Sequence, residues 1–269
     1  MRIPILFILA SSMITAALGQ EGTNTADKPV QVRKLTLTAK DLPGAALQPI
    51  AASLEGGTYA LDDLQDKIQQ KLRDQGYYLA HTETPQLTNV RPEGPARSAD
   101  VSVELQAGDL YHMGEISFRG TTAFPKDRMR SLFPIQAGSL YSSSAVATGL
   151  EKLKNLYEGE GYADIGAVPA IAVDDARHII DISVEIEEGY PYLFGPLTFE
   201  GAEPTAGTEK TLLAAWKALE GKRYNPEVLK KWLAANAPKT PQGAPPIHPH
   251  AEGIADPDAH LMDVRLKFE

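Results

Sequence analysis

Three histidines and two aspartates near the C-terminal end are the side chains best suited to hold a metal: His248, His250, Asp256, Asp258 and His260. Imidazole nitrogens and carboxylate oxygens are ligands that zinc and copper accept. Their spacing is not specific for a metal site, and no rigid element is expected in this proline-rich stretch to hold the ligands. We therefore predict a solvated connector here, with no metal and no other cofactor.

Short matches to phosphate-binding loops are also weak. Gly159 and Gly161 begin like a nucleotide-binding fingerprint, but they end an expected helix and the third glycine is missing. Gly221-Lys222 lacks the glycine that a P-loop places five residues earlier. The sequence has no Gly-x-Ser-x-Gly elbow, no His-Glu-x-x-His pair and no cysteine. We expect a protein that is not an enzyme.

The balance of charge is acidic. The 269 residues include 35 acidic and 26 basic ones, which gives a formal net charge of -9. Nucleic acids and anionic lipids are bound by basic faces, so we expect neither as a direct partner. The adjacent acids Asp174-Asp175 and Glu187-Glu188 fall at expected turns and strand ends, where we predict that they are solvated.

The N-terminal residues 1–19 resemble a cleavable secretory signal. Arg2 precedes an apolar run over residues 3–14, and Ala17-Leu18-Gly19 contains the small residues typical of a signal-peptide cleavage site. A retained membrane anchor is the alternative, although the run is shorter than the roughly 18 residues of a spanning helix. No later segment is apolar enough to span as a helix. We expect an exported, periplasmic protein with a short arm at residues 20–29.

The sequence repeats itself with a period of about 81 residues. The stretch from Gly108 to Gly120 recurs from Gly189 to Gly201, and its glycines and Tyr111 are identical in both copies. A glycine three residues before a tyrosine recurs three times, which indicates three copies. We expect the repeat positions to serve turns and packing. They are Gly56, Tyr59, Gly76, Gly108, Gly114, Gly120, Gly138, Tyr141, Gly161, Gly189, Gly195, Gly201, Gly221 and Tyr224.

Each copy is predicted to be a small α+β module with the order β-α-α-β-β. In the second copy, apolar residues alternate over 115–119 and 179–187, and they recur at helical spacing over 146–157. Two helices would then cover a three-stranded mixed sheet. We place the modules at residues 30–110, 111–192 and 193–269. The third looks incomplete, because residues 237–258 are rich in proline and a regular strand there should be absent or short.

These features resemble the POTRA domain, the polypeptide-transport-associated module. The resemblance depends on the glycine-to-tyrosine step, on the helix closing at Tyr157-Glu-Gly-Glu-Gly-Tyr162, and on the last strand running into Glu188-Gly189. It covers about residues 30–269. Such modules stand before the β-barrel in outer-membrane assembly and secretion proteins of the BamA and TamA kinds, in the bacterial surface antigen family. The 269 residues show no series of barrel strands, and we expect an arm that works with a separate partner.

The resemblance implies a role in binding proteins. Its partners would be an outer-membrane β-barrel protein or assembly-machinery subunit, together with unfolded outer-membrane clients, and any membrane association would run through that partner. In the family, clients add a strand to an exposed sheet edge. The edges expected here are residues 77–84 and 162–171, and a solvated edge that serves only the fold is an equal alternative. The candidate docking residues are Tyr77, Tyr78, Ala80, Thr82, Tyr162, Asp164, Gly166, Val168 and Ala170.

Two classes of function follow from this reading. The first is a non-enzymatic module for outer-membrane protein assembly or secretion, which binds client or partner polypeptides by β-augmentation. The second is a structural envelope adaptor that binds one specific partner. A small-molecule or metal-binding periplasmic protein is a distant third.

Overall fold

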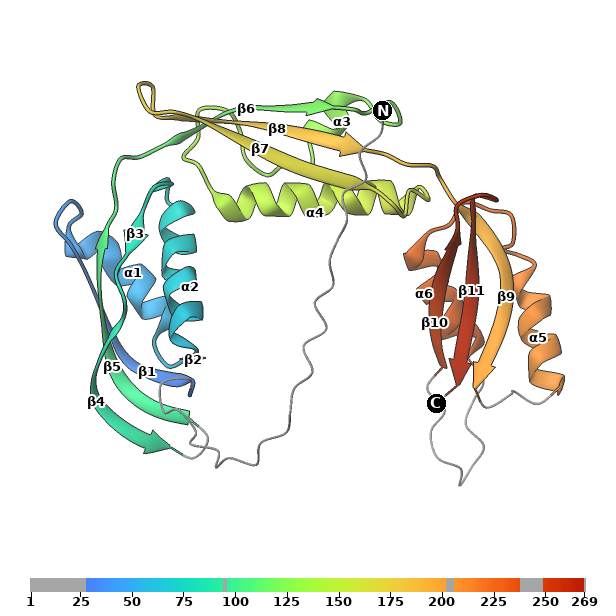
Figure 1. The fold of residues 1–269 in the computed structure, drawn as a ribbon, viewed down its shortest axis with the longest axis horizontal. Coiled ribbons are helices and arrows are strands. Elements are labelled where there is room, and N and C mark those ends of the chain that lie inside the picture. The colour runs from blue at the N-terminus through green and yellow to red at the C-terminus, as the bar shows by residue number, and fades with distance from the viewer. Residues whose placement is uncertain (1–27, 94–95, 202–205, 238–248, 269) are drawn as a thin grey trace, which may run out of the picture.

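A computed structural model describes residues 28–93, 96–201, 206–237 and 249–268. They form three sheets with six helices, and the three parts follow one another as an arch (Figure 1). We call these parts the first unit (residues 30–106), the second unit (112–187) and the third unit (193–268). The predicted signal at 1–19 and nearly all of the arm at 20–29 lie outside the described residues. No helix in the described ranges is both long and apolar enough to span a membrane.

The second unit shows the repeated pattern in its simplest form. Its sheet has the order β6-β8-β7, with β8 parallel to β6 and antiparallel to β7. The long helix begins at Ser142, whose hydroxyl accepts the Ala145 N–H and so caps the first turn. The elements are β6 (His112–Arg119), α3 (Lys126–Arg130), α4 (Ser143–Gly159), β7 (Gly166–Asp174) and β8 (Ile179–Glu187).

The first unit contains additional strands. Its five-stranded sheet has the order β2-β1-β5-β3, and β4 also pairs with β5. Helix α1 forms although Pro49 lies within it. The predicted edge at residues 77–84 contains only the two-residue edge strand β3, and the longer outer strand is β4, which the prediction did not include. The elements are β1 (Val30–Ala39), α1 (Gly44–Leu54), β2 (Thr58–Tyr59), α2 (Leu61–Arg73), β3 (His81–Thr82), β4 (Gln86–Glu93) and β5 (Ala96–Gln106).

The third unit corrects a second prediction. A regular strand, β10, pairs with β11 without interruption from Pro249 opposite Phe268 to Asp256 opposite Leu261. Pro249 is tolerated because it is the first residue of the strand. The sheet order β10-β11-β9 therefore matches that of the second unit. The elements are β9 (Leu193–Gly201), α5 (Ala206–Trp216), α6 (Pro226–Asn236), β10 (Pro249–Asp256) and β11 (Leu261–Phe268).

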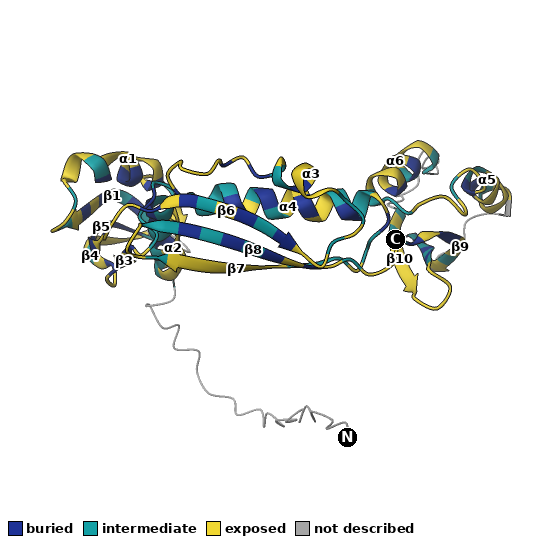
Figure 2. Cartoon of the chain, turned by 90° about the horizontal axis from the view of Figure 1, so that it is seen from above, coloured by how far each residue is buried: buried dark blue, intermediate teal, exposed yellow. Residues whose placement is uncertain are grey.

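Each unit packs its own hydrophobic core between the sheet and the helices. Leu64 and Leu72 are fully buried in the first core, Tyr157 in the second, and Trp216 is 2% exposed in the third. The central strands alternate as predicted, and Figure 2 shows buried residues along β6 and β8 beside an exposed β7. Along the inner side of the arch, α2 contacts α4, and α4 contacts α6 (Figure 1). The long helices therefore connect three separate cores.

Candidate protein-interaction edge and the junctions beside it

Strand β7 is an open edge of the second sheet. Its nine residues pair with β8 over their full length, and its other side has no strand partner within the described residues. Three large apolar side chains on it are exposed: Val168 by 67%, Ile171 by 44% and Val173 by 39%. An edge of this length that carries apolar side chains is a template for pairing with another chain.

The sequence-predicted docking residues of this region fall into two groups. Gly166, Val168 and Ala170 lie in β7. Tyr162 and Asp164 precede the strand. The Tyr162 ring packs edge-on against Tyr157, and the Asp164 carboxylate accepts the hydroxyl of Tyr192. Only the first group therefore lies in the strand to which a further strand could be added.

Pro169 indicates which backbone groups of β7 face outward. A strand tolerates proline where its nitrogen points to solvent, because proline has no N–H to give to the neighbouring strand. Pro169 lies in β7, and the pairing of β7 with β8 has no register shift. Backbone direction alternates along a strand, so the groups of Ala167, Ile171 and Val173 should point the same way as those of Pro169.

The outer edge of the first sheet is broken. Strand β3 has two residues, Pro85 follows it, and β4 has a register shift between Thr88 and Arg91. Asn89 in this irregularity has a φ of 52°. Bulges and prolines of this kind protect an edge from further pairing.

The predicted docking residues of the first unit also lie elsewhere than expected. Ala80 and Thr82 are buried, with 4% and 1% of their surface exposed. Tyr77 packs against the first core, whereas Tyr78 packs against the core of the second unit. These side chains serve packing and the junction between units.

The outer strand of the third sheet carries three ionisable side chains, His250, Glu252 and Asp256. Glu252 of β10 forms an ion pair with Lys267 at 2.9 Å. Ile254 is the one large apolar residue of β10 that is exposed, by 36%. Among the antiparallel outer strands β4, β7 and β10, β7 is therefore the one that pairs without a register shift and exposes several large apolar side chains, although its Pro169 has no N–H to donate.

The histidines and aspartates considered as metal ligands have other contacts. His250 lies in β10, and the His260 ring stacks on Tyr190 at 4.5 Å between centroids. Asp256 accepts the amides of Asp258 and Ala259 in the turn. His248 lies outside the described residues.

The same backbone joint connects each unit to the next. The N–H of Tyr111 donates to the carbonyl of Gly76 at 2.9 Å, and the N–H of Tyr192 donates to Gly161 at 2.8 Å. Each of these tyrosines in turn accepts, on its carbonyl, the amide of the tyrosine before the next long helix, Tyr141 or Tyr224. The repeated glycines and tyrosines thus encode the joint between units.

Glycine is needed at these joints for a local reason. Gly76 has a φ of 96° and Gly161 has a φ of 92°, a left-handed conformation that side chains disfavour. A Cβ on Gly161 would also lie 2.8 Å from the carbonyl oxygen of Tyr192. The predicted turn role of these two positions agrees with this geometry.

The first junction has an additional lock around Asp74, the residue that follows α2. Its carboxylate accepts the hydroxyls of Ser142, Ser143 and Ser144 and the Ser144 N–H, at 2.7 to 3.1 Å. Burial raises the pKa of Asp74, but these hydrogen bonds outweigh it and leave the pKa below its ordinary value. One charged group therefore holds the start of α4 against the end of α2.

Tyr78 packs across the first junction, next to the hydrogen bonds of Asp74. The Tyr78 ring of the first unit meets Tyr141 at 5.1 Å and Tyr111 at 6.2 Å, both edge-on. Burial, the main cause, raises the pKa of Tyr141 to about 12, against the opposite effect of the Arg73 charge. Arg73 therefore lies close enough to Tyr141 to influence its hydroxyl.

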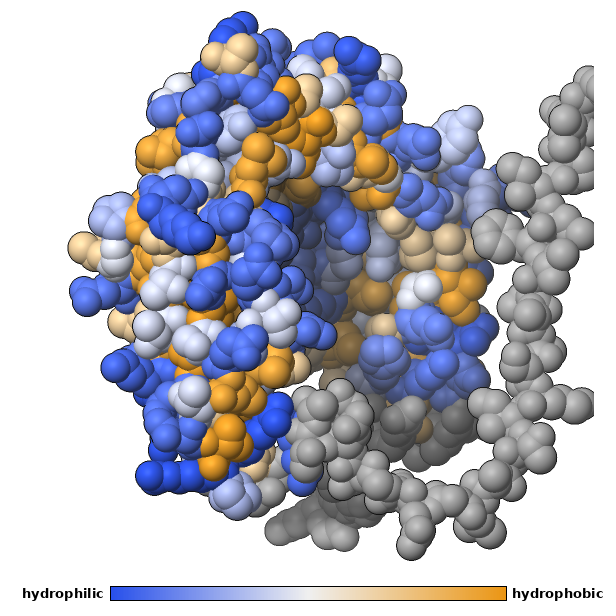
Figure 3. Space-filling model, turned by 60° about the vertical axis from the view of Figure 1, so that its left-hand side comes forward, coloured by the Kyte–Doolittle hydropathy of each residue, from blue (hydrophilic) through white to orange (hydrophobic). Residues whose placement is uncertain are grey.

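A groove opens at the first junction, next to the β7 edge. It has a volume of about 410 Å³ and is lined by Arg73, Tyr78, Leu79, Tyr141 and Ile171, among others. Ile171 belongs to both the groove and β7. Figure 3 shows that the molecule is hollowed along its inner side, with hydrophilic and hydrophobic side chains mixed around the hollow. The groove therefore adjoins the β7 edge at Ile171.

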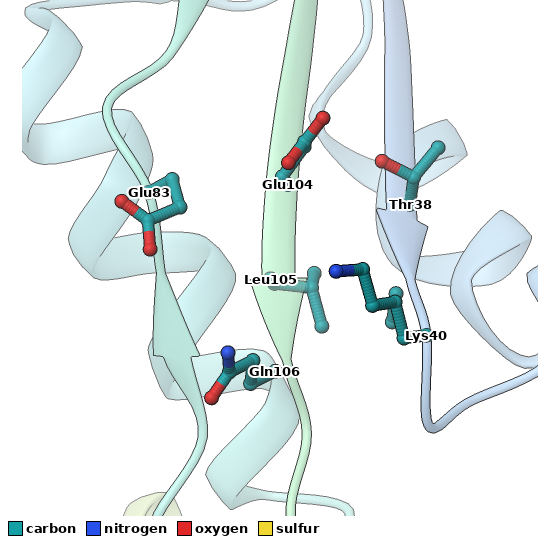
Figure 4. A pocket seen from close by; sticks show the side chains of 7 residues that line it. Thr38, Lys40, Glu83, Glu104, Leu105 and Gln106 are labelled. Carbon is teal, nitrogen blue, oxygen red and sulfur yellow. The ribbon is translucent and has the colours of Figure 1, made fainter.

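A second depression, of about 290 Å³, lies on the first sheet (Figure 4). Lys40, Glu83 and Glu104 come from neighbouring segments around it. It is lined by both a lysine and glutamates. They favour no one class of ligand.

The predicted solvation of the paired acids is wrong for Glu188. Its carboxylate accepts five hydrogen bonds, from the Thr121, Thr122 and Tyr157 hydroxyls and from the amides of Thr122 and Ala123. Burial opposes the charge, but these bonds dominate and lower the pKa of Glu188 to about 2. Glu188 therefore fastens the end of β8 to the loop after β6.

Comparison with known proteins defines the class of module. Residues 111–189 match the sequence model of the POTRA family, described as the surface antigen variable number repeat. The match covers the second unit and its flanking turns. Its elements follow one another as strand, helix, helix, strand and strand, as those of the third unit also do.

The fold of the chain is similar to that of a solved POTRA array. Haemophilus influenzae BamA POTRA domains 3 to 5 superpose with a TM-score of 0.61 at 15% identity, over 94% of this chain and 100% of that one. Haemophilus ducreyi BamA lacking POTRA domains 1 to 3 gives 0.44 at 18% identity, over 59% and 29%. POTRA domains 1 to 3 of Omp85 from Anabaena give 0.34 at 13% identity, over 90% and 96%. The match of residues 111–189 to the POTRA family and the similarity of the fold to the Haemophilus influenzae POTRA domains confirm the resemblance.

Proposed function

We propose that the chain is a non-enzymatic periplasmic array of three POTRA modules that serves outer-membrane protein assembly or secretion. It binds extended segments of client or partner polypeptides by β-augmentation at β7. The single observation that carries this proposal is the open edge of β7, nine residues long and exposing Val168, Ile171 and Val173. The POTRA match of residues 111–189 supports the assignment to outer-membrane biogenesis.

The differences among the three edges favour one docking strand. The β4 edge is broken by a bulge, and the β10 edge carries an ion-paired glutamate and exposes one large apolar side chain, whereas β7 pairs regularly with β8 and exposes three. An added strand gains main-chain hydrogen bonds from the outward-facing groups of β7, and alternate side chains give it modest selectivity. Few side chains are then indispensable for binding.

The test introduces proline at a β7 residue whose backbone N–H should point away from β8. Ile171→Pro removes an outward N–H, and Ile171→Ala is the matched control that removes the side chain alone. With a fluorescein-labelled ten-residue peptide of alternating valine and threonine, we expect Ile171→Pro to weaken binding about tenfold, the equivalent of one or two lost hydrogen bonds. Far-UV circular dichroism and the melting temperature should match those of Ile171→Ala. Equal peptide affinity for the two variants contradicts docking at β7.

An adaptor for one partner is the second candidate function. It is favoured by the contrast among the outer strands β4, β7 and β10, of which β7 alone combines regular pairing with several exposed large apolar side chains, since a single docking strand suits a one-to-one complex. A photo-crosslinking residue at Val168, which is 67% exposed, separates the two candidates in periplasmic extracts. A spread of barrel precursors supports the client-binding role, and one stoichiometric product supports the adaptor.

A further inference from the structure

The groove at the first junction contains an unpaired cation. Arg73 lines it and, within the part of the chain that the structure describes, its side chain makes no ion pair and no hydrogen bond. Its Nε atom is buried without a partner. No carboxylate lines the groove. A buried guanidinium nitrogen without an acceptor is unusual, because buried polar atoms are nearly always hydrogen-bonded.

The neighbouring acid is already engaged. Asp74 follows Arg73 in sequence, but its carboxylate is directed to the three serines at the start of α4, which supply four donors. The Arg73 guanidinium is therefore a positive charge that no carboxylate in the groove neutralises, although the whole chain carries a net charge of -9. The remaining lining is largely aromatic and aliphatic, through Tyr78, Leu79 and Ile171.

The position of Ile171 links the groove to the docking edge. Its partner across the sheet is the buried Ile182, so its side chain lies on the face that packs toward α4. An added strand would run about 4.8 Å from β7, and its residues on this face would be spaced two apart. One of them would then lie over Ile171, within the opening that Arg73 lines.

We propose that this groove selects docked segments that carry an acidic side chain, with an apolar side chain two residues away on the same face. Arg73 pairs with the carboxylate, while Leu79, Tyr78 and Ile171 contact the apolar side chain. The inference rests on the proposed docking at β7 and deepens it, because backbone pairing alone does not distinguish sequences. Arginine suits this role, since its planar group can donate two parallel hydrogen bonds to a carboxylate.

The experiment compares two labelled ten-residue peptides that differ at one central position, glutamate or glutamine, in an otherwise alternating valine and threonine sequence. Fluorescence anisotropy measures their affinities for the full chain and for Arg73→Gln, Arg73→Lys and Lys152→Gln. Lys152 lies on the exposed side of α4, so Lys152→Gln is a control that removes the same charge elsewhere.

We expect the full chain to bind the glutamate peptide about tenfold more tightly, as a charged hydrogen-bonded pair provides. Arg73→Gln should bind both peptides equally, Arg73→Lys should keep part of the preference, and Lys152→Gln should keep all of it. A preference for glutamate that survives in Arg73→Gln overturns the inference.

The outcomes also separate this inference from the docking proposal. If the full chain binds both peptides equally and Ile171→Pro weakens both, docking at β7 stands and the role of Arg73 is overturned. If neither peptide binds the full chain, docking at β7 is overturned and the selectivity of the groove falls with it. Unchanged circular dichroism of Arg73→Gln shows that a loss of preference does not come from unfolding.

Discussion

The two junctions share one backbone joint but differ in the side chains that lock it. Counted from the joint glycines, Asp74 and Tyr78 of the first junction correspond to Gly159 and Ala163 of the second. The first junction therefore has a carboxylate that receives four donors and a ring that enters the next core. The second lacks both.

The second junction relies on hydrogen bonds to carbonyls at the end of α4. Asn225 donates to the Gly159 carbonyl at 2.9 Å, and Arg223 donates to the Glu160 carbonyl at 3.1 Å. The comparison teaches that the repeated residues define the joint, while unrepeated residues set its strength. The amides of Tyr111 and Tyr192 are matched reporters, because each donates across one junction and its hydrogen exchange measures local opening.

The largest effect is expected from Tyr78→Ala. The substitution removes a ring packed on the second core and its two edge-on contacts, which should destabilise the first junction by about 3 kcal/mol. Exchange of the Tyr111 amide should accelerate, while that of Tyr192 should not change. Equal acceleration at both amides would show that the junctions open together.

Asp74→Ala should have the next largest effect. Four donors at the start of α4 lose their acceptor, at a cost of about 2 kcal/mol. Asp74→Asn is the matched control, because it keeps one oxygen and should lose less. Protection of the Tyr111 amide and of the first turn of α4 measures the change, and an unaffected α4 terminus would contradict the lock.

Acid should weaken the first junction by a smaller amount. The pKa of Asp74 is lowered by folding, so its contribution is present above the unfolded pKa near 4 and is lost as the pH falls through the folded value. Protection of the Tyr111 amide should decline below about pH 4 in the full chain and much less in Asp74→Asn. A matching decline in Asp74→Asn would assign the acid effect to another carboxylate, with Glu188 the first to examine.

Asn225→Ala should have the smallest effect. It removes a cap of α6, which accepts the amides of Glu227 and Val228, and also the bond to Gly159, for about 1 kcal/mol. Both tryptophans lie in the third unit, so their fluorescence follows unfolding there. The Tyr192 amide should lose protection and the Tyr111 amide should keep it. A loss larger than that of Asp74→Ala would reverse the proposed order of the junctions.

Much of the fold could be predicted from the sequence because the signals are local and repeated. Alternation in residues 179–187 and the glycine after each long helix gave the correct elements of the second unit. The strand at Pro249–Asp256 was missed because prolines before it suggested a loop, although an edge strand tolerates proline at its first residue. The outer strand of the first unit was misplaced because Pro85 and a bulge interrupt it.

The candidate site was less predictable, because its parts come from different units. Asp74 and Ser144 are 70 residues apart in the sequence. Arg73 and Ile171 come to line the same groove only when the first and second units pack together. No sequence period encodes such contacts. The exposure of β7 was expected from the family resemblance. The bulge in β4 and the ion pair on β10 could be found only from the structure.

The joint at Gly161 and Tyr192 also bears on how such an array can grow. A segment cut between Gly108 and Gly189 carries the tyrosine amide donor of one joint, at Tyr111, and the glycine acceptor of the next, at Gly161, so one copy can join another. Gene duplication of that segment would add a unit without requiring a new interface. One repeat of the sequence therefore corresponds to one structural unit that can be added. Insertion of a second copy of residues 109–189 should lengthen the arch while preserving each core.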